Sequence, residues 1–387
     1  MSDPRNVRLS DLVTPGCRVA VADGFGMPTK VFGELSAAAR AAGNVRLVLG
    51  WCPAALEDFD PEAFADVRSI MAGYGLRRLV DQGLVHYIPA RLQTVLKLLR
   101  GALRPDVLVA SVGRGPNGWN FTTEVAWMRT AVETGAIVAA VERPNHPVSD
   151  AGPPIPESQL RFIGSDPSAP ILSVWAEPGD IHRAIGSHIA PFIEAGSRLQ
   201  FGPGPLGVGV LDALKVPVRI DTGLINDAVP LLERRGQLLD TPIAPYMAGS
   251  EELFAWAKTK APMLYGLEIT HSQARLGSGA PLVTINTALE IDIDGQVNVE
   301  AVGGSAIAGI GGQPDFAFAG ASALSGGLSI VAVTTRSGKN STLVERLSAP
   351  VSTPSHDIDV IVTEKGAADL RGLDRRERRG AIARIWD

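Results

Sequence analysis

The sequence predicts an α/β protein with two similar open domains, each a mostly parallel sheet with helices on both faces. Three observations support this fold class. The 387 residues exceed one ordinary hydrophobic core, so about two domains are expected. Short apolar runs alternate with amphipathic stretches of helical length, which is typical of βαβ units. The order of elements that begins at Gly16 begins again at Gly196, which indicates two related halves, although two βαβ starts can also resemble each other by chance.

The first βαβ unit follows directly from the N-terminal segment. Its strand covers 18–22, its helix 29–42 and its second strand 45–49. Pro28 just before the helix and Gly43 just after it are the expected end signals. Because a helix joins the two strands, the unit predicts a parallel sheet.

The rest of the first half continues this alternation. We expect a domain boundary near 189–195, so the predicted domains are 1–190 and 191–387. The predicted helices are 70–80, 91–103, 125–134 and 178–190, the strands 107–112 and 137–141, and the irregular loops 113–121 and 144–156.

The second half opens on the stretch around which the chain is organised. A strand at 198–201 leads into a Gly/Pro loop at 202–207, a short helix at 208–214 and a second strand at 216–222. In open α/β sheets, ligands bind at loops that follow the carboxyl ends of strands. We therefore expect this loop and the corner Asp221-Thr222-Gly223 to face one pocket.

The later elements are a mixture of strands, turns and helices. Asp294-Gly295 is the strongest hairpin signal in the chain. The basic run 375–379 is interpreted as the solvated face of a helix rather than a phosphate contact. The other predicted elements are a helix at 250–258, strands at 328–334 and 357–363, and a loop at 336–341.

Composition and charge exclude several classes of function. A net charge of −5 gives no footprint for nucleic acid. The N-terminus has no apolar signal-peptide core, and no apolar run reaches the roughly 20 residues of a membrane span. Cys17 and Cys52 form no CxxC motif, which argues against a thiol metal site and leaves a disulfide open. We expect a cytoplasmic enzyme.

Common catalytic and metal motifs are missing from the sequence. His182 and His188 are six residues apart, so they face different sides of a helix and do not have metal-ligand spacing. There is no HExxH and no GxSxG, and Gly338-Lys339 is followed by Asn340 where a Walker motif needs Ser or Thr. We expect no metal site and no permanently bound cofactor.

The loop Gly202–Gly207 matches GxGxxG, between a strand and a helix. Asp221 ends the next strand, where an acid that binds a ribose would lie. NAD(P) binding is therefore an alternative. Pro203 and Pro205 count against it, because each removes a backbone N–H group from a loop that would offer such groups to pyrophosphate.

A set of longer stretches resembles the acetyl-CoA hydrolase/transferase family, which includes 4-hydroxybutyrate and succinyl-CoA:acetate CoA-transferases. The resemblance covers nearly the whole chain and is most specific in its C-terminal half. The stretches that carry it are LVTPGCRVAVADGFGMPT, RPDVLVASVGRGPNGWNF with PNHP, RLQFGPGPLGVGVLDAL, INTALEIDIDGQVNVEAVGG, GIGGQPDFAFAGASALSGGLSIVAV and DIDVIVTEKGAADLRGLDRRER.

This resemblance implies two CoA-transferase-like α/β domains with a CoA thioester site between them. It also implies thioester hydrolysis or CoA transfer between acyl groups, with acyl-CoA as substrate and a carboxylic acid as an acceptor. A homodimer or higher homo-oligomer is implied, without nucleic acid or membrane.

The chain departs from the family at the residue that matters most for covalent chemistry. The family has a pattern like His-Thr-Glu-Met, in which the Glu is the nucleophile that attacks the acyl-CoA carbonyl. The matching residues here are Asp221-Thr222-Gly223-Leu224, so Gly223 holds the nucleophile position. Asp221 lies about 6.6 Å away along a strand, which suits a general base for water better than a nucleophile. A salt bridge or helix cap is the other interpretation of Asp221.

Further site residues are expected on backbone and side-chain grounds. Backbone N–H groups at Gly204, Gly207 and Gly209 are candidates for an oxyanion hole, as are those of Gly311 and Gly312. By resemblance, the CoA side is lined by Gln296, Asn298, Gly311, Gly312 and Gln313. Asn298 has the alternative of local hairpin hydrogen bonds, and the Gly309–Gly312 loop that of a tight turn.

The sequence thus favours an acyl-CoA hydrolase or CoA-transferase. The alternatives are a catalytically silent CoA-thioester-binding relative, a subunit that needs a partner to supply a carboxylate, and an NAD(P)-binding oxidoreductase. Glu124 and Glu345 are other acids near family stretches, with no motif that assigns them a role.

Overall fold

The computed structural model describes residues 6–149, 151–173, 175–260 and 263–387. Its contacts divide the chain into two compact units. Unit 1 comprises 1–172, 245–269 and 306–311, and unit 2 comprises 173–244, 270–305 and 312–387. Two segments from the second half of the sequence therefore pack with unit 1, while the limits 1–190 and 191–387 stay a prediction about sequence domains.

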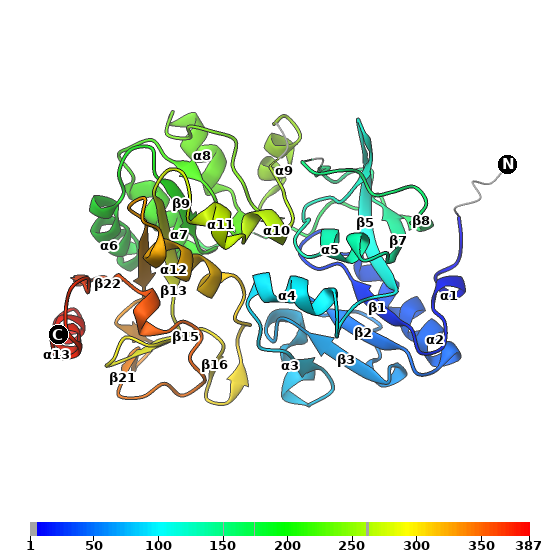
Figure 1. The fold of residues 1–387 in the computed structure, drawn as a ribbon, viewed down its shortest axis with the longest axis horizontal. Helices are drawn as coiled ribbons and strands as arrows, with labels where there is room; N and C mark the ends of the chain where they lie inside the picture. The colour runs from blue at the N-terminus through cyan, green and yellow to red at the C-terminus, as the bar shows by residue number, and fades with distance from the viewer. Residues whose placement is uncertain (1–5, 150, 174, 261–262) are drawn as a thin grey trace. The chain divides into compact units, whose positions relative to one another are not determined.

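Unit 1 is built on a sheet in the order β4-β3-β2-β1-β5-β7-β8, with β6 beside β5 (Figure 1). Every pair along this path is parallel, and only β6 runs antiparallel to its neighbour. The strands are β1 Arg18–Val21, β2 Arg46–Leu49, β3 Asp66–Ser69, β4 His86–Tyr87, β5 Val107–Gly115, β6 Gly118–Asn120, β7 Ile137–Glu142 and β8 Leu160–Ser165, with β12 Tyr246–Met247 outside this sheet.

The main core of unit 1 joins helix α2 to the first strands. Phe32, Leu35 and Ala39 of α2 pack with Val19 and Val21 of β1 in one buried apolar cluster. The helices are α1 Leu9–Leu12, α2 Phe32–Ala42, α3 Arg77–Asp81, α4 Leu92–Leu99, α5 Met128–Glu133, α9 Glu251–Ala257 and α10 Leu267–Thr270, whose last residue belongs to unit 2, with 3₁₀ turns at Thr29–Val31, Pro61–Ala63 and Tyr74–Leu76.

Unit 2 is built on a sheet in the order β10-β9-β13-β18-β22-β23. All its pairs are parallel except β22 with β23. The strands are β9 Arg198–Phe201, β10 Arg219–Ile220, β13 Leu282–Thr287, β18 Leu328–Ala332, β22 Val360–Thr363 and β23 Gly366–Asp369. The predicted α/β fold class with mostly parallel sheets is confirmed in both units.

Helices and short strands complete unit 2. Helix α12 packs on β13 and β18, and α6 packs against α7. The helices are α6 Asp180–Ile189, α7 Pro205–Ala213, α8 Ala228–Arg234, α11 Gln273–Leu276, α12 Gln313–Ser322 and α13 Arg375–Arg384, with 3₁₀ turns at Ala190–Phe192 and Ser355–Asp357. The short strands are β11 Leu224–Ile225, β14 Glu290–Asp292, β15 Val297–Asn298, β16 Ala301–Val302, β17 Ser305–Ala306, β19 Arg336–Ser337, β20 Asn340–Ser341 and β21 Leu343–Val344.

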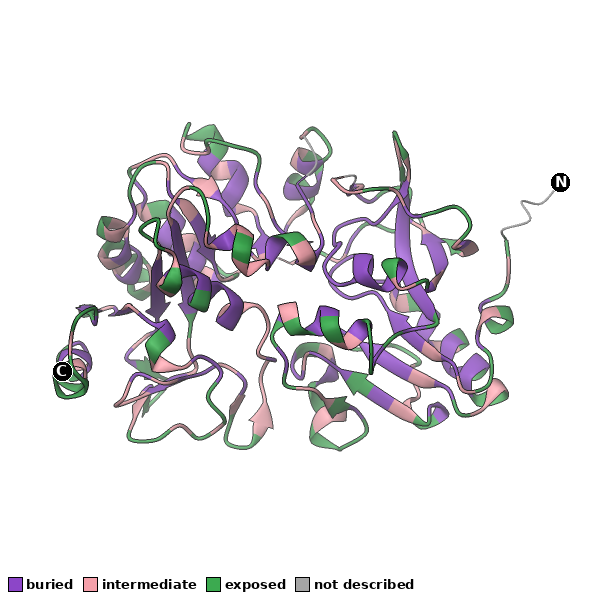
Figure 2. Ribbon diagram, viewed as in Figure 1, coloured by how far each residue is buried: buried purple, intermediate pink, exposed green. Residues whose placement is uncertain are grey.

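The burial pattern follows this architecture (Figure 2). The central strands are buried along almost their whole length, as expected for parallel strands covered on both faces. Helix α13 is exposed at Arg375, Arg376 and Arg379, which confirms the solvated face predicted for the basic run. The hairpin predicted around Asp294-Gly295 is present as β14 and β15.

Several predicted element limits were wrong. The helix predicted over 70–80 starts only at Tyr74, since β3 ends at Ser69 and the chain turns between them. The strand predicted over 216–222 is regular only at β10, and the helix predicted from 208 begins at Pro205, a residue suited to a first helical turn. The loop predicted over 336–341 contains the hairpin β19–β20, and strands β3 and β8 were not predicted.

Each sheet has one point where the strand order reverses direction. In unit 1 this point lies between β1 and β5, and in unit 2 between β9 and β13. Loops that leave the carboxyl ends of two such strands diverge and form the crevice where open α/β sheets bind ligands. The loop after β1 carries Asp23, and the loop after β9 carries Gly202–Gly207.

Candidate functional site

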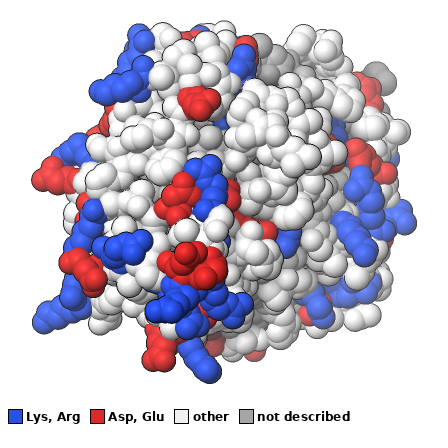
Figure 3. Space-filling view, turned by 60° about the vertical axis from the view of Figure 1, so that its left-hand side comes forward, with Lys and Arg blue, Asp and Glu red and all other residues white. Residues whose placement is uncertain are grey.

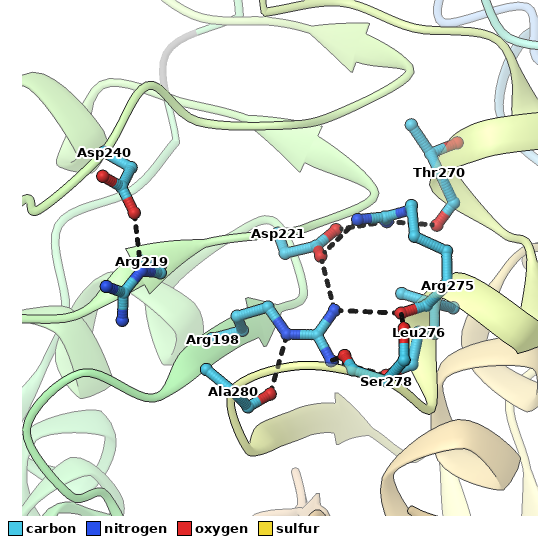
Figure 4. A network of polar contacts seen from close by, with 9 residues as sticks. All are labelled: Arg198, Arg219, Asp221, Asp240, Thr270, Arg275, Leu276, Ser278 and Ala280. Carbon is cyan, nitrogen blue, oxygen red and sulfur yellow. Dashed lines mark hydrogen bonds and ion pairs between the residues drawn. The ribbon is translucent and has the colours of Figure 1, made fainter.

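The corner after β10 holds Asp221 in a buried ion-pair network (Figure 4). Arg275 donates from Nη1 to Oδ2 at 2.8 Å and from Nη2 to Oδ1 at 2.7 Å. Arg198 Nη1 lies 3.3 Å from Oδ2. Asp221 is 2% exposed, and both of its carboxylate oxygens accept from guanidinium groups. This geometry agrees with the interpretation of Asp221 as a salt-bridge partner. A general-base role for Asp221 stays a prediction without geometric support.

Hydrogen bonds of Arg198, one of the two arginines, also connect the loop after α11 to strand β9. Arg198 donates from Nε to the carbonyl of Ala280 and from Nη2 to the carbonyls of Leu276 and Ser278, at 2.6–2.9 Å. Burial lowers the pKa of Arg198, and the charge of Asp221 opposes that shift. Because Asp221 is the anion that compensates this buried positive charge, its main effect here is on stability.

Gly223 lies two residues farther along and is half-buried. A Cβ atom built on it meets only Cε2 of Phe316 within 4 Å, at an ordinary contact distance of 3.7 Å. Its backbone is also outside the left-handed region. Neither the space around a Cβ atom nor the backbone conformation therefore requires glycine here.

A buried histidine stands behind Phe316 and was not found by sequence reasoning. The rings of His271 and Phe316 are 4.8 Å apart. His271 Nδ1 lies 3.0 Å from Thr270 Oγ1, while Nε2 is buried without a hydrogen-bond partner among the described residues. Burial, with a smaller effect of Arg275, lowers the pKa of His271 to about 3, so the ring is neutral. No motif surrounds this histidine that could have identified it.

The glycine-rich loop ends in the N-terminus of α7, for which Gly204 is the N-cap at φ +102°. The first N–H groups of a helix have no partner inside it, so Gly204 and Gly207 offer N–H groups there while Pro205 cannot. Gly209 lies in the second turn, where its N–H is used within the helix. A Cβ on Gly209 would come within 2.8 Å of the carbonyl of His182 in α6, so this glycine serves helix packing. The oxyanion role predicted for Gly209 has no geometric support, and those of Gly204 and Gly207 stay predictions.

The same loop does not have the acid that a dinucleotide site needs. A ribose would require a free carboxylate at the end of the next strand. Asp221 occupies that place with both oxygens bound to Arg275 and one also near Arg198. The ion pair therefore argues against the NAD(P) alternative.

The residues predicted to line CoA fall into two groups. On the hairpin, Gln296 Oε1 accepts from the N–H of Ser355 at 2.7 Å. Asn298 is fully buried, donates to Glu290 Oε1 at 2.9 Å, and accepts from the N–H of Glu300 at 2.9 Å. Both amides are used in the hairpin, which fits the local role that the sequence left open for Asn298.

The second group lies where α12 begins. Gly311 is in the left-handed region at φ +64°, and its carbonyl accepts from the N–H of Leu92 at 3.1 Å within unit 1. Gly312 is the N-cap of α12 and Gln313 its first residue. Nε2 of Gln313 is buried without a hydrogen-bond partner among the described residues. Of the predicted set, Gln313 alone thus has an unused buried side-chain donor.

Two buried acids in unit 1 form a second cluster. Asp23 and Glu124 are each 1% exposed, and the charge of Asp23 acts on Glu124. Burial raises the pKa of Asp23 to about 6 and that of Glu124 to about 8. Sequence reasoning noted Glu124 without a role and missed Asp23. The available signal was its place directly after the first strand.

Other classes of site find no support in the described part of the chain. No group of His, Cys, Asp or Glu there could hold a metal ion. Cys17 and Cys52 are both buried and free, so no disulfide joins them. On the face drawn in Figure 3, basic and acidic side chains are interspersed. No helix of the described chain is both long enough and apolar enough to span a membrane.

Comparisons with known proteins point to one family. Residues 249–387 match the model of the acetyl-CoA hydrolase/transferase C-terminal domain. The chain is 28% identical over 340 residues to 4-hydroxybutyrate coenzyme A transferase of Clostridium kluyveri, covering 82% of this chain and 78% of that protein. It is 30% identical over 227 residues to acetyl-CoA hydrolase of Eremothecium gossypii, covering 52% of this chain and 42% of that protein.

A solved structure shows the same fold. The crystal structure of 4-hydroxybutyrate CoA-transferase from Porphyromonas gingivalis superposes with a TM-score of 0.77 at 24% identity. The match covers 97% of this chain and 92% of that chain. The resemblance inferred from the sequence motifs is confirmed.

Proposed function

We propose that this chain is an acyl-CoA-dependent enzyme that hydrolyses a CoA thioester or transfers CoA from one acyl group to another. The observation that carries the proposal is the C-terminal domain match together with similarity to named CoA-transferases and hydrolases over most of the chain. CoA thioester is then the substrate, and no permanently bound cofactor is part of the proposal.

Gly223 favours hydrolysis over transfer through a glutamyl intermediate. A covalent route needs a side chain that attacks the thioester carbonyl, and glycine has none. A Cβ atom at this position would make only an ordinary contact with Phe316, so packing around the Cβ atom does not explain the glycine. A route in which water attacks the thioester needs no residue at this position.

The direct test is a panel of acyl-CoA thioesters with and without carboxylate acceptors. Hydrolysis releases free CoA thiol without an acceptor, whereas transfer forms a new acyl-CoA only when an acceptor is added. We expect thiol release without an acceptor. Absence of both products with every acyl-CoA contradicts the enzymatic proposal.

The silent relative is the second candidate, and the missing nucleophile side chain favours it. Calorimetry with CoA and with NAD separates the candidates: CoA binding without turnover indicates a silent relative or a subunit that needs a partner, and binding of NAD alone contradicts the family-based proposal. The homo-oligomer implied by the resemblance stays a prediction, which sedimentation equilibrium measures.

A further inference from the structure

We infer that Asp23 and Glu124 of unit 1 are the acid–base pair of thioester hydrolysis, Asp23 as the base for water and Glu124 as the acid for the departing sulfur. The inference rests on the proposed function and adds the residues that take over from the absent nucleophile.

Both acids lie at the place where an open α/β sheet binds ligands. Asp23 follows β1, and Glu124 follows the β5–β6 hairpin. Strands β1 and β5 are neighbours and mark the point where the strand order of this sheet reverses. The loops from these strands therefore border the crevice expected at a topological switch point.

Asp23 is held in the orientation that a general base needs. Its Oδ2 accepts from the backbone N–H of Trp51 at 2.9 Å, from Nε1 of Trp127 at 2.9 Å and from the hydroxyl of Tyr246 at 3.0 Å. Its Oδ1 is buried and has no hydrogen-bond partner among the described residues. One oxygen thus fixes the carboxylate and the other is left to accept a proton.

Glu124 is fixed in a similar way from the other side of the loop. Its Oε2 accepts from the N–H of Gly26 at 3.0 Å and from Oγ1 of Thr123 at 2.6 Å. A Cβ on Gly26 would lie 2.6 Å from Glu124 Oε1 and 2.9 Å from Thr122 Oγ1. The glycine therefore allows the carboxyl of Glu124 and the hydroxyl of Thr122 to approach the backbone more closely than a side chain at residue 26 would permit.

Unpaired neutral groups at the same place indicate a missing polar ligand. Thr122 is 0% exposed, and its Oγ1 has no hydrogen-bond partner among the described residues. Nε1 of Trp51, whose backbone already binds Asp23, is likewise buried and unpaired there. A buried polar group without a partner costs stability, so an unpaired hydroxyl near Gly26 and an unpaired indole N–H on a residue that binds Asp23 are groups that a bound water or substrate would satisfy.

The pair also has no cation that would make it a structural salt bridge. No Lys, Arg or His of the described residues lies within 4 Å of either carboxylate, and Arg143 acts on Glu124 only at longer range. With its pKa raised to about 8 by burial, Glu124 is mostly protonated at neutral pH, while Asp23, at about 6, is mostly ionised. One acid and one base are therefore present together, as acid–base catalysis requires.

The reaction balances with water as the only co-reactant. The water oxygen bonds to the thioester carbonyl carbon while Oδ1 of Asp23 takes a proton from that water. The C–S bond of the tetrahedral adduct then breaks, and the sulfur takes the proton of Glu124. The proton on Asp23 returns to Glu124, and the carboxylic acid product releases its own proton to solvent.

The test measures thiol release by the full-length protein with its best acyl-CoA. Glu124→Gln and Asp23→Asn are expected to lower kcat by about 10²- to 10⁴-fold, with KM changed much less. Glu268→Gln is the matched control, because burial also raises the pKa of this acid of unit 1 and it is outside the pair. It is expected to keep wild-type kcat.

A second variant tests the pair even if Glu124→Gln or Asp23→Asn does not fold. Tyr246→Phe removes one donor from ionised Asp23, which raises the pKa of Asp23 and moves the acidic limb of the kcat–pH profile to higher pH. The other titratable groups around the pair are Cys52 beside Asp23 and Arg143 near Glu124. The limbs of the wild-type profile are expected near pH 6 and pH 8 and belong to the coupled pair.

The outcomes separate the inference from the proposed function. Wild-type turnover with loss in Glu124→Gln and a shifted limb in Tyr246→Phe supports both. Wild-type turnover that survives in Glu124→Gln and Asp23→Asn, or an unmoved limb in Tyr246→Phe, overturns the acid–base pair and leaves the proposed function standing. Absence of turnover by the wild type with every acyl-CoA overturns both.

Discussion

Asp221 and Asp23 are both buried acids at the end of a sheet strand, Asp221 after β10 and Asp23 after β1, yet their surroundings differ. Each follows a strand of a parallel sheet, and they are 2% and 1% exposed. Asp221 is bound by two guanidinium groups, whereas Asp23 is bound by three neutral donors and no cation. Burial raises the pKa of Asp23 to about 6, although its three neutral donors oppose that shift. The comparison indicates that Asp23, the acid without cationic partners, is the better candidate for a catalytic role.

The largest effect that tests this contrast is the loss of the charge at Asp221. Asp221→Asn removes the buried anion that pairs with the partly buried Arg198 and Arg275, which should lower the free energy of unfolding by about 3 kcal/mol. Urea denaturation at pH 7 measures it. The control is Asp240→Asn, which removes an exposed ion pair with Arg219 and should cost about 1 kcal/mol or less. Equal losses in the two variants would contradict the structural role of Asp221.

The pH dependence of stability tests the other side of the contrast. The folded-state pKa of Glu124 is raised to about 8, so the native state binds more protons than the unfolded state and stability falls as pH rises. Between pH 5 and pH 9 the ionisation of Glu124 should lower the free energy of unfolding by roughly 3–4 kcal/mol. Glu124→Gln should remove most of that slope in denaturation curves recorded across this range. An unchanged slope would show that Glu124 is not protonated in the folded protein.

A smaller effect is expected from one donor of Asp23. Tyr246→Phe removes a hydrogen bond to a charged group, which should lower stability by about 1.5–3 kcal/mol at pH 8, where Asp23 is ionised. The loss should shrink at pH 5, where Asp23 is protonated. Thermal unfolding at the two pH values measures this difference, and an equal loss at both would mean that the hydroxyl does not sense the charge of Asp23.

The smallest stability effect is expected at Gly223. Gly223→Ala adds a Cβ that makes one ordinary contact with Phe316 at an ordinary backbone conformation, so the free energy of unfolding should change by less than about 1 kcal/mol. Gly223→Glu should then be folded as well, and it tests the comparison chemically. Incubation with acyl-CoA and hydroxylamine, followed by peptide mass analysis, should detect a modified residue 223 if the family's covalent route returns. An unmodified Gly223→Glu protein that still hydrolyses acyl-CoA would place the chemistry elsewhere.

The sequence predicted the fold better than the site, and particular residues show why. Apolar runs such as 107–112 and the Pro28 and Gly43 signals report local backbone preferences, which survive in the folded chain. The partners of Asp221 are not local: Arg275 lies 54 residues away and no motif joins the two. Asp23 depends on Trp127 and Tyr246, which the sheet and a later segment bring to it. Burial and proton binding arise from such tertiary contacts, so spacing alone could not predict them.

The assignment of Tyr246 to unit 1 has a consequence for synthesis on the ribosome. The tyrosine follows Asp23 by 223 residues, and unit 1 is complete only when 306–311 has also emerged. At about 5–20 residues per second, Asp23 waits roughly 10–45 seconds for this partner. During that time Asp23 lacks one of its three hydrogen-bond donors. The first half of the chain is therefore not expected to finish unit 1 on its own, and a fragment cut at residue 190 should lack the finished environment of Asp23.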